Sequence, residues 1–430
     1  MITLKNYTLS ENGRRIDYHY SATGPAVRFL NPAESFFVRY DHDISSCPPG
    51  IAVIPFIANF ITLAWFGKFD LVVPEVEATF AGSLVQLRAE FQRMYPRYPL
   101  TGVLVAPRSA PISWPATKSL MLFSGGMDAY TTLIRHHSEN LDLVTILGAD
   151  IEITDTTQWH RCLNHIKTEP FSGRLPHLAI TANMRTFYND NVEASLVFGW
   201  WGKVQHGPGL LGLLAPLSFI RRASLAYIAS SYNVPMVWGS TQSADEKIKW
   251  GGLSVVHDAA ELSRQAKAEV IAAFCQQRQE SIQLRVCYSE VARDGNCGRC
   301  EKCYRTMMNL ILAGVDPRSF GFPFTAETYP QLFTRLSTIR ASAGLRVFWE
   351  EISRAASLAL KNKNFFVLTD RDSEVNFLKR LADGEINRAL ERNHRPWRDH
   401  LARWKFIIRV RFPRFYNAGR GLVRLLRRLK

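Results

Sequence analysis

Residues 119–128 read Ser-Leu-Met-Leu-Phe-Ser-Gly-Gly-Met-Asp, and they predict a buried strand, a tight turn and the start of a helix. Leu120–Phe123 is a short continuous apolar run, which is typical of a strand inside a parallel sheet. Glycines follow it at once, where a Cβ would hinder both a turn and the approach of a ligand. Backbone N–H groups and the dipole of the helix expected at Ala129–Ser138 would favour an anion such as phosphate. An ordinary strand–turn–helix corner is the alternative.

Around this stretch the pattern alternates between strands and helices. Strands are expected at Leu120–Phe123, Asp142–Leu147, His177–Thr181, Pro235–Gly239 and Ile282–Cys287. Helices are expected at Ala129–Ser138, Thr156–Lys167, Leu210–Ser231, Ala259–Phe274 and from Cys303 to Leu312. Such alternation predicts an α/β fold with a parallel sheet covered on both faces. Ligands of these sheets bind beyond the carboxyl ends of the strands, where the glycine turn also lies.

The 430 residues are long enough for more than one domain. We expect an N-terminal α+β region at 1–115, a nucleotide-binding domain at 116–315 and a C-terminal helical region at 316–430. The first region carries no chemical motif and is interpreted as a packing or dimerisation domain, so a homodimer is a candidate assembly. Its long apolar run, Ile51–Phe66, contains Pro55 and Asn59 and is interpreted as buried core.

The composition, 47% hydrophobic and 21% charged, is that of a globular chain. Met1–Arg15 lacks the apolar segment of a secretory signal, and we expect a cytoplasmic protein. The net charge of +15 is concentrated near the end, since residues 391–430 hold thirteen Lys and Arg against two acids. Phe406–Leu429 mixes arginines with bulky apolar residues. It predicts a solvated basic helix face, or contact with an anionic membrane surface, a nucleic acid or a protein partner.

Four of the seven cysteines cluster late in the chain, at Cys287, Cys297, Cys300 and Cys303. Three of them are two residues apart, and the fourth precedes them by ten positions, so four thiolates can surround one ion. This spacing predicts a closed structural zinc site, with an iron–sulfur cluster as the main competitor. Arg293, Arg299 and Lys302 would offset the negative charge of the thiolates. We expect the metal to tie strand and helix together beside the ligand pocket.

The glycine loop and the cysteine quartet together resemble one family. Ser-Gly-Gly-Met-Asp is similar to the pyrophosphate-binding loop of PP-loop ATP pyrophosphatases, whose domain is of the adenine nucleotide alpha hydrolase type. The cysteine spacing is similar to the zinc site of their 7-cyano-7-deazaguanine synthase (QueC-like) branch. The resemblance covers about residues 116–315, and the long extensions fit a divergent member.

The resemblance implies an ATP-dependent enzyme that uses Mg²⁺ and contains Zn²⁺. It would adenylate a small-molecule carboxylate, such as a 7-deazaguanine acid, release pyrophosphate and form a carbon–nitrogen product. By the same resemblance the nucleotide-binding residues would be Ser124, Gly125, Gly126, Met127 and Asp128. Ala129 departs from the family, which usually has a hydroxyl there, and Tyr130 or Thr131 would have to replace that phosphate contact.

Further site residues are predicted on weaker grounds. Arg264 and Lys267 resemble the basic contact of the family to ATP phosphates, and with Asp128 they form the predicted catalytic set; the alternative is a solvated helix face. Gly239 and Ser240 follow a predicted strand on the ligand side and are assigned to nucleotide binding, or else to an ordinary turn. The pairs 206–207 and 257–258 each begin with a histidine that could orient substrate or serve structure alone.

Two other functions are compatible with the sequence. One is a non-catalytic nucleotide-binding accessory protein, favoured by Ala129 and by the poor match of Trp200–Gly209 to the substrate segment of the family. The other is a tRNA-modifying relative, such as a sulfur transferase, with the basic tail bound to RNA. That chemistry requires reactive cysteines without metal near the nucleotide.

Overall fold

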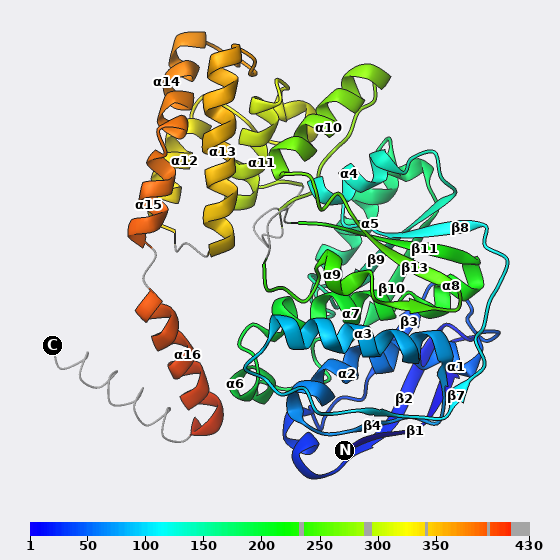
Figure 1. The fold of residues 1–430 in the computed structure, drawn as a ribbon. Coiled ribbons are helices and arrows are strands. Elements are labelled where there is room, and N and C mark those ends of the chain that lie inside the picture. The colour runs from blue at the N-terminus through cyan, green and yellow to red at the C-terminus, as the bar shows by residue number, and fades with distance from the viewer. Residues whose placement is uncertain (232–235, 288–294, 340–342, 394–395, 414–430) are drawn as a thin grey trace.

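The computed structural model describes residues 1–231, 236–287, 295–339, 343–393 and 396–413, and these build one large mixed sheet with helices around it (Figure 1). The described strands of this sheet number eleven, in the order β12-β13-β11-β8-β9-β10-β3-β2-β1-β4-β6. Five consecutive strands at its centre run parallel: β13 (Leu253–Asp258), β11 (Ala223–Ala229), β8 (Lys118–Leu122), β9 (Leu141–Leu147) and β10 (His177–Ala182). Every residue of β9 is buried, as expected for a strand inside such a sheet. The α/β class with a largely parallel central sheet is therefore confirmed.

The strands of the N-terminal region extend this same sheet. Strand β3 (Phe37–Tyr40) pairs antiparallel with β10, and Tyr40 lies opposite Ile180. Beyond it follow β2 (Arg15–Ala22), β1 (Ile2–Ser10), β4 (Leu71–Val72) and β6 (Leu104–Val105). Helix α2 (Ile54–Gly67) is buried along its whole length, which confirms the interpretation of this apolar run as core. Residues 1–115 thus share one hydrophobic core with part of residues 116–315.

Two strand predictions and one helix prediction were wrong. Residues 210–231 do not form one helix. Helix α7 (His206–Gly212) ends at Gly212, and α8 (Ala215–Arg221) is capped by Arg222, whose φ of 54° is left-handed, before β11 begins. The fourth parallel strand is therefore β11, since residues 236–239 form no strand and Pro235 lies outside the described part. Residues 282–287 likewise form no strand, and β13 is the fifth. Periodicity failed because a short apolar run fits both a buried helix and a buried strand.

Helices on the sheet faces and in the C-terminal region agree with the expectations. Those nearest the site are α4 (Met127–Arg135), α5 (Thr156–Thr168), α10 (Arg264–Arg278) and α11 (Glu301–Leu312). After them come α12 (Thr328–Leu336), α13 (Ala343–Asn362), α14 (Arg371–Ala382), α15 (Glu385–Asn393) and α16 (Pro396–Arg411). In Figure 1, α10–α15 form one group, while α16 lies apart from them near α6 (Asn191–Ser195). No helix in the described ranges is long and apolar enough to cross a bilayer.

The remaining elements are short, apart from α3 (Ala78–Met94), which packs beside α2 in the N-terminal region. They are α1 (Pro49–Ala52), α9 (Gln242–Asp245), β5 (Val76–Glu77), β7 (Arg108–Ser109), β12 (Lys249–Trp250), the 3₁₀ turns η1 (Gly24–Phe29), η2 (Ser172–Arg174) and η4 (Pro317–Phe320), and the π-helical turn η3 (Trp201–Gln205). Of these, η3 bears most directly on the site, because it forms part of the wall of a cavity of about 740 Å³.

Candidate functional site

The glycine loop forms the predicted strand–turn–helix unit. Strand β8 ends at Leu122, and α4 begins at Met127 with Gly126 as its N-cap. Gly125 has a φ of +76°, in the left-handed region that favours glycine. At Gly126 a Cβ would meet only Ser124 Oγ at 3.5 Å and the Arg285 carbonyl oxygen at 3.8 Å, both ordinary contacts. The backbone therefore favours glycine at 125, whereas at 126 the fold would accept a Cβ and the glycine leaves space beside the helix N-terminus.

A cavity of about 740 Å³ opens over this loop. Its wall includes Ser124, Gly126, Met127 and Asp128, together with residues that follow β9, β10 and β11. It thus lies at the carboxyl ends of four neighbouring parallel strands, where ligands of such sheets bind. The volume is within the range of small-molecule and cofactor sites.

The cavity wall is strongly basic. Its cationic residues are Arg185, Lys203, Arg264, Arg285, Lys302 and Arg305, against the acidic residues Asp128, Asp150 and Glu193. Aromatic rings of Phe123, Trp201, Trp238 and Phe348 also contribute. A concave surface with this charge and these rings suits an anionic ligand that carries a flat apolar group.

Asp128 is brought together with both basic residues predicted on α10. A guanidinium nitrogen of Arg264 lies 2.8 Å from Oδ2 of Asp128, and Lys267 Nζ lies 3.3 Å from Oδ1. Lys267, with only 1% of its surface exposed, also donates to the carbonyl oxygen of Ser230, just after β11. Burial alone would raise the pKa of Asp128, but Arg264, Lys267 and Arg305 outweigh it and hold this pKa below its ordinary value.

Several wall residues were not predicted from the sequence as ligand contacts. Phe348 of α13 stacks with two guanidinium groups, since its ring centroid lies 4.7 Å from Arg264 Cζ and 4.0 Å from Arg305 Cζ. Lys302, predicted to compensate the thiolates, instead lines the cavity. Burial lowers the pKa of Lys302; Asp150 opposes this effect and Arg305 adds to it. In the sequence, the only signal for Lys302 and Arg305 was their positive charge beside the cysteines. No sequence signal pointed to Phe348.

The segment that matched the family poorly also contributes to the cavity wall. Trp201, Lys203 and His206 belong to η3 and the start of α7, and all three line the wall. Nδ1 of His206 is buried and has no hydrogen-bond partner among the described atoms. Burial lowers the pKa of His206, although Asp150 and Asp245 act in the opposite direction. This segment thus shares one cavity with the glycine loop.

Other predicted residues lie away from the cavity wall. Ser240 Oγ donates to Asp245 Oδ2 at 2.6 Å, and Gly239 packs so closely on the backbone of Val204 that a Cβ would approach it to 2.8 Å. Nδ1 of His257 lies 2.8 Å from Asp245 Oδ2, inside the structure. The loop after the predicted strand therefore packs against Val204 and Asp245, and His257 is a buried hydrogen-bond partner of Asp245.

The two residues proposed to replace the missing hydroxyl at Ala129 are engaged elsewhere. The hydroxyl of Tyr130 contacts Ser172 Oγ at 3.2 Å, and Thr131 Oγ1 donates to the carbonyl oxygen of Met127 at 3.0 Å. Both side chains are buried and neither lines the cavity. Of the predicted loop, Ser124 therefore supplies the only side-chain hydroxyl on the cavity wall.

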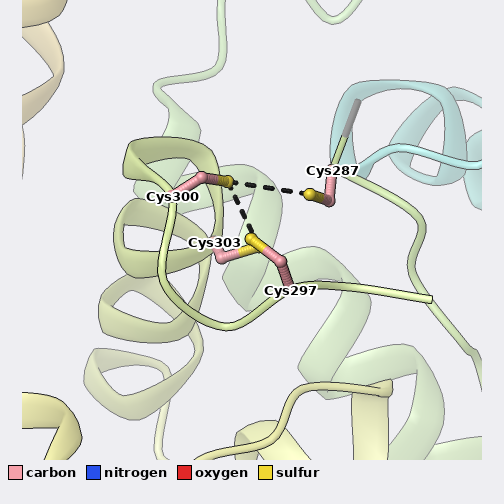
Figure 2. Close-up of side chains that lie close together, drawn as sticks. All are labelled: Cys287, Cys297, Cys300 and Cys303. Carbon is pink, nitrogen blue, oxygen red and sulfur yellow. Dashed lines mark hydrogen bonds between the residues drawn. The ribbon is translucent and has the colours of Figure 1, made fainter. Parts of the chain in front are cut away.

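The four late cysteines meet at one point (Figure 2), and their sulfur atoms all lie within 4.8 Å of one another. Cys300 Sγ is 3.4 Å from Cys303 Sγ and 3.8 Å from Cys287 Sγ, and Cys297 Sγ is 3.8 Å from Cys303 Sγ. A tetrahedron of thiolates about zinc, with Zn–S bonds of about 2.3 Å, places its sulfurs about 3.8 Å apart. The quartet therefore fits a closed metal site such as zinc. Arg293 lies outside the described residues.

One buried asparagine holds the two cysteine-bearing segments together. Asn296 Oδ1 accepts from the backbone N–H of Val286 at 3.0 Å and of Cys287 at 3.3 Å. Its Nδ2 donates to the carbonyl oxygens of Leu284 at 2.8 Å and Gly321 at 3.2 Å. The cysteine spacing predicted the quartet but not the role of Asn296, although this residue lies directly before Cys297.

The metal centre adjoins the cavity along the chain. Arg285 and Val286, directly before Cys287, line the cavity, and so do Lys302 and Arg305 on either side of Cys303. Anchoring these cysteines to one ion would hold two parts of the basic wall in place.

No family profile, no curated protein and no solved structure matches this chain. The family resemblance therefore rests on the loop and the cysteine quartet alone.

Proposed function

We propose that this chain is an ATP-dependent enzyme, similar to the QueC-like branch of the PP-loop ATP pyrophosphatases. It would adenylate a small carboxylate, release pyrophosphate and form a carbon–nitrogen bond. The observation that carries the proposal is the convergence of the glycine loop, the N-terminus of α4 and several cationic side chains on one cavity of about 740 Å³.

In this proposal the departing pyrophosphate lies against the start of α4. The backbone N–H groups there and the helix dipole stabilise its developing negative charge. Arg264, Arg285, Lys302 and Arg305 reach the same cavity and add positive charge to its wall. Trp201, Lys203 and His206 of the same wall would contact the carboxylate substrate.

The two implied metals fit this chain differently. Zinc suits the cysteine quartet, where a closed site with four thiolates would supply structural support alone. Asp128 does not suit a magnesium ligand in this arrangement, because both carboxylate oxygens are engaged by Arg264 and Lys267. The charge of the nucleotide phosphates is therefore assigned to the basic side chains of the wall.

The same ion pairs favour a second candidate, a nucleotide-binding accessory protein without turnover. Asp128 is neutralised by two cations, and the family hydroxyl is replaced by Ala129, which is buried. A tRNA sulfur transferase is less favoured. The cysteine on the cavity wall, Cys162, is buried, and burial raises its pKa despite the opposing charge of Arg285. A thiol of this kind is a weak nucleophile.

The test is release of pyrophosphate by the full chain, incubated with Mg²⁺, ATP, ammonium and a set of carboxylates that includes 7-carboxy-7-deazaguanine. Gly126→Ala should abolish release and weaken ATP binding at least tenfold, because its Cβ would occupy the space beside the helix N-terminus. Gly82→Ala is the matched control, because Gly82 is exposed on α3 and a Cβ there would meet nothing within 4 Å.

Three outcomes separate the candidates. Pyrophosphate release by wild type and Gly82→Ala but not by Gly126→Ala supports the enzyme. Calorimetric binding of ATP without release of pyrophosphate supports the accessory protein. If wild type binds no ATP, both nucleotide-based functions are wrong.

A further inference from the structure

Helix α16 presents an apolar stripe to solvent. Trp397 is 57% exposed, Leu401 45% and Trp404 62%, and spacings of four and three residues place them on one helix face. Phe412, which follows the helix, is 60% exposed. Among residues whose exposure the structure describes, Trp397, Trp404 and Phe412 are the exposed tryptophans and phenylalanines. Large aromatic side chains in water mark an interaction surface when they gather in this way.

The opposite face of α16 holds it to the body of the protein. The ring of Phe406 lies 5.6 Å from that of Phe198, in an edge-on arrangement. Phe406 is about 200° around the helix from Trp404, at about 100° per residue. Arg409, about 140° from Trp404, pairs with Asp190 beside α6 at 3.3 Å. At the end of the helix, Arg411 donates to Ser195 Oγ of α6 at 3.3 Å, although it lies only about 20° from Trp404. The stripe is therefore directed away from the body by contacts on the inner side.

Positive charge flanks the stripe. The sequence of α16 holds five Lys and Arg against one acidic residue, and Arg403 and Lys405 are exposed on either side of Trp404. The following residues, 414–430, add six more Lys and Arg interspersed with leucine and no acidic residue. An apolar stripe with tryptophans, bordered by cations, is typical of helices that lie in the plane of a membrane interface.

We propose that α16 docks this protein onto the surface of a membrane that contains anionic lipids. The stripe of Trp397, Leu401 and Trp404 would enter the boundary between headgroups and acyl chains, which suits indole rings. Arg403 and Lys405 would contact the anionic headgroups. A nucleic acid would satisfy the cations and stack on the indoles but would leave Leu401 in water, so lipid is the better match.

The test is co-sedimentation of the full chain with vesicles of phosphatidylcholine, alone or with 30% phosphatidylserine. Wild type should bind the anionic vesicles and lose most of this binding when salt is raised, with little binding to phosphatidylcholine alone. Leu401→Ser/Trp404→Ser should bind at least tenfold more weakly. Leu358→Ser is the matched control and should bind as wild type, since this leucine is 59% exposed on α13, away from the stripe.

A second measurement locates the contact. Brominated acyl chains should quench part of the tryptophan fluorescence of vesicle-bound protein, and Trp397→Phe/Trp404→Phe should bind but lose this quenching. The proposal is overturned if wild type ignores anionic vesicles, or if Leu401→Ser/Trp404→Ser binds them unchanged. If wild type binds single-stranded RNA but not anionic vesicles at the same salt, a nucleic acid is the partner and the proposal is equally overturned.

Discussion

Replacing Asn296 by alanine tests how the metal centre is built. The side chain is 8% exposed and makes four hydrogen bonds to backbone groups, at 2.8 to 3.3 Å. A net contribution of about 1 kcal/mol for each bond gives a loss of about 4 kcal/mol, less where water enters the space. Two of the freed groups are the N–H of Val286 and Cys287, so the segment carrying one metal ligand loses its anchor.

The loss should appear in both metal affinity and stability. Partners that orient metal ligands typically contribute about 10–100-fold to metal affinity, and Asn296→Ala should fall in this range. Competition with a chromophoric zinc chelator measures the affinity, and urea unfolding of the zinc-loaded full chain measures the stability. Asn296→Asp should be intermediate, because it retains the acceptor for two N–H groups but places an oxygen against the Leu284 and Gly321 carbonyls.

Asn140→Ala is the matched control for this experiment. Asn140 is exposed and donates one hydrogen bond, to the carbonyl oxygen of Thr117 at 2.9 Å, so its loss should change unfolding by less than about 1 kcal/mol. The reasoning is refuted if Asn296→Ala binds zinc and unfolds in urea as the Asn140→Ala variant does.

Further predictions concern the loop, its carboxylate and the thiols. Gly125→Ala should lower the unfolding free energy in urea by about 1–2 kcal/mol, since φ there is +76°. The pKa of Asp128 is lowered in the folded chain, so its ion pairs should stabilise the fold fully above the unfolded pKa of about 3.9. This stabilisation should be lost as the pH falls through the folded pKa. Urea unfolding of Asp128→Asn should lack this acid dependence. With a disulfide-exchange reagent at pH 8 and a chelator, Cys300 should react first, because its hydrogen bond with Cys303 lowers its pKa to about 5. Burial raises the pKa of Cys47 to about 12 and of Cys275 to about 11, so these two should stay slow until denaturant is added; equal rates for all would contradict the site.

The sequence by itself determined the units that are local in the chain. The apolar run, the two glycines and the helix start lie within about ten residues, so their strand–turn–helix order follows from local preferences. The cysteine quartet was equally accessible, because three of its members share one short loop and helix start. Both could be named without knowledge of which elements pack together.

Tertiary structure alone decided which strands neighbour the loop and which side chains face it. Residues 223–229 form a strand because β8 and β13 pair with both of their edges, a choice that an apolar run cannot encode by itself. Arg264 and Asp128, 136 residues apart, form an ion pair, and Phe348 reaches them from α13. Charge and burial depend on neighbours distant in sequence, so the electrostatics of this cavity exist only once the chain is folded.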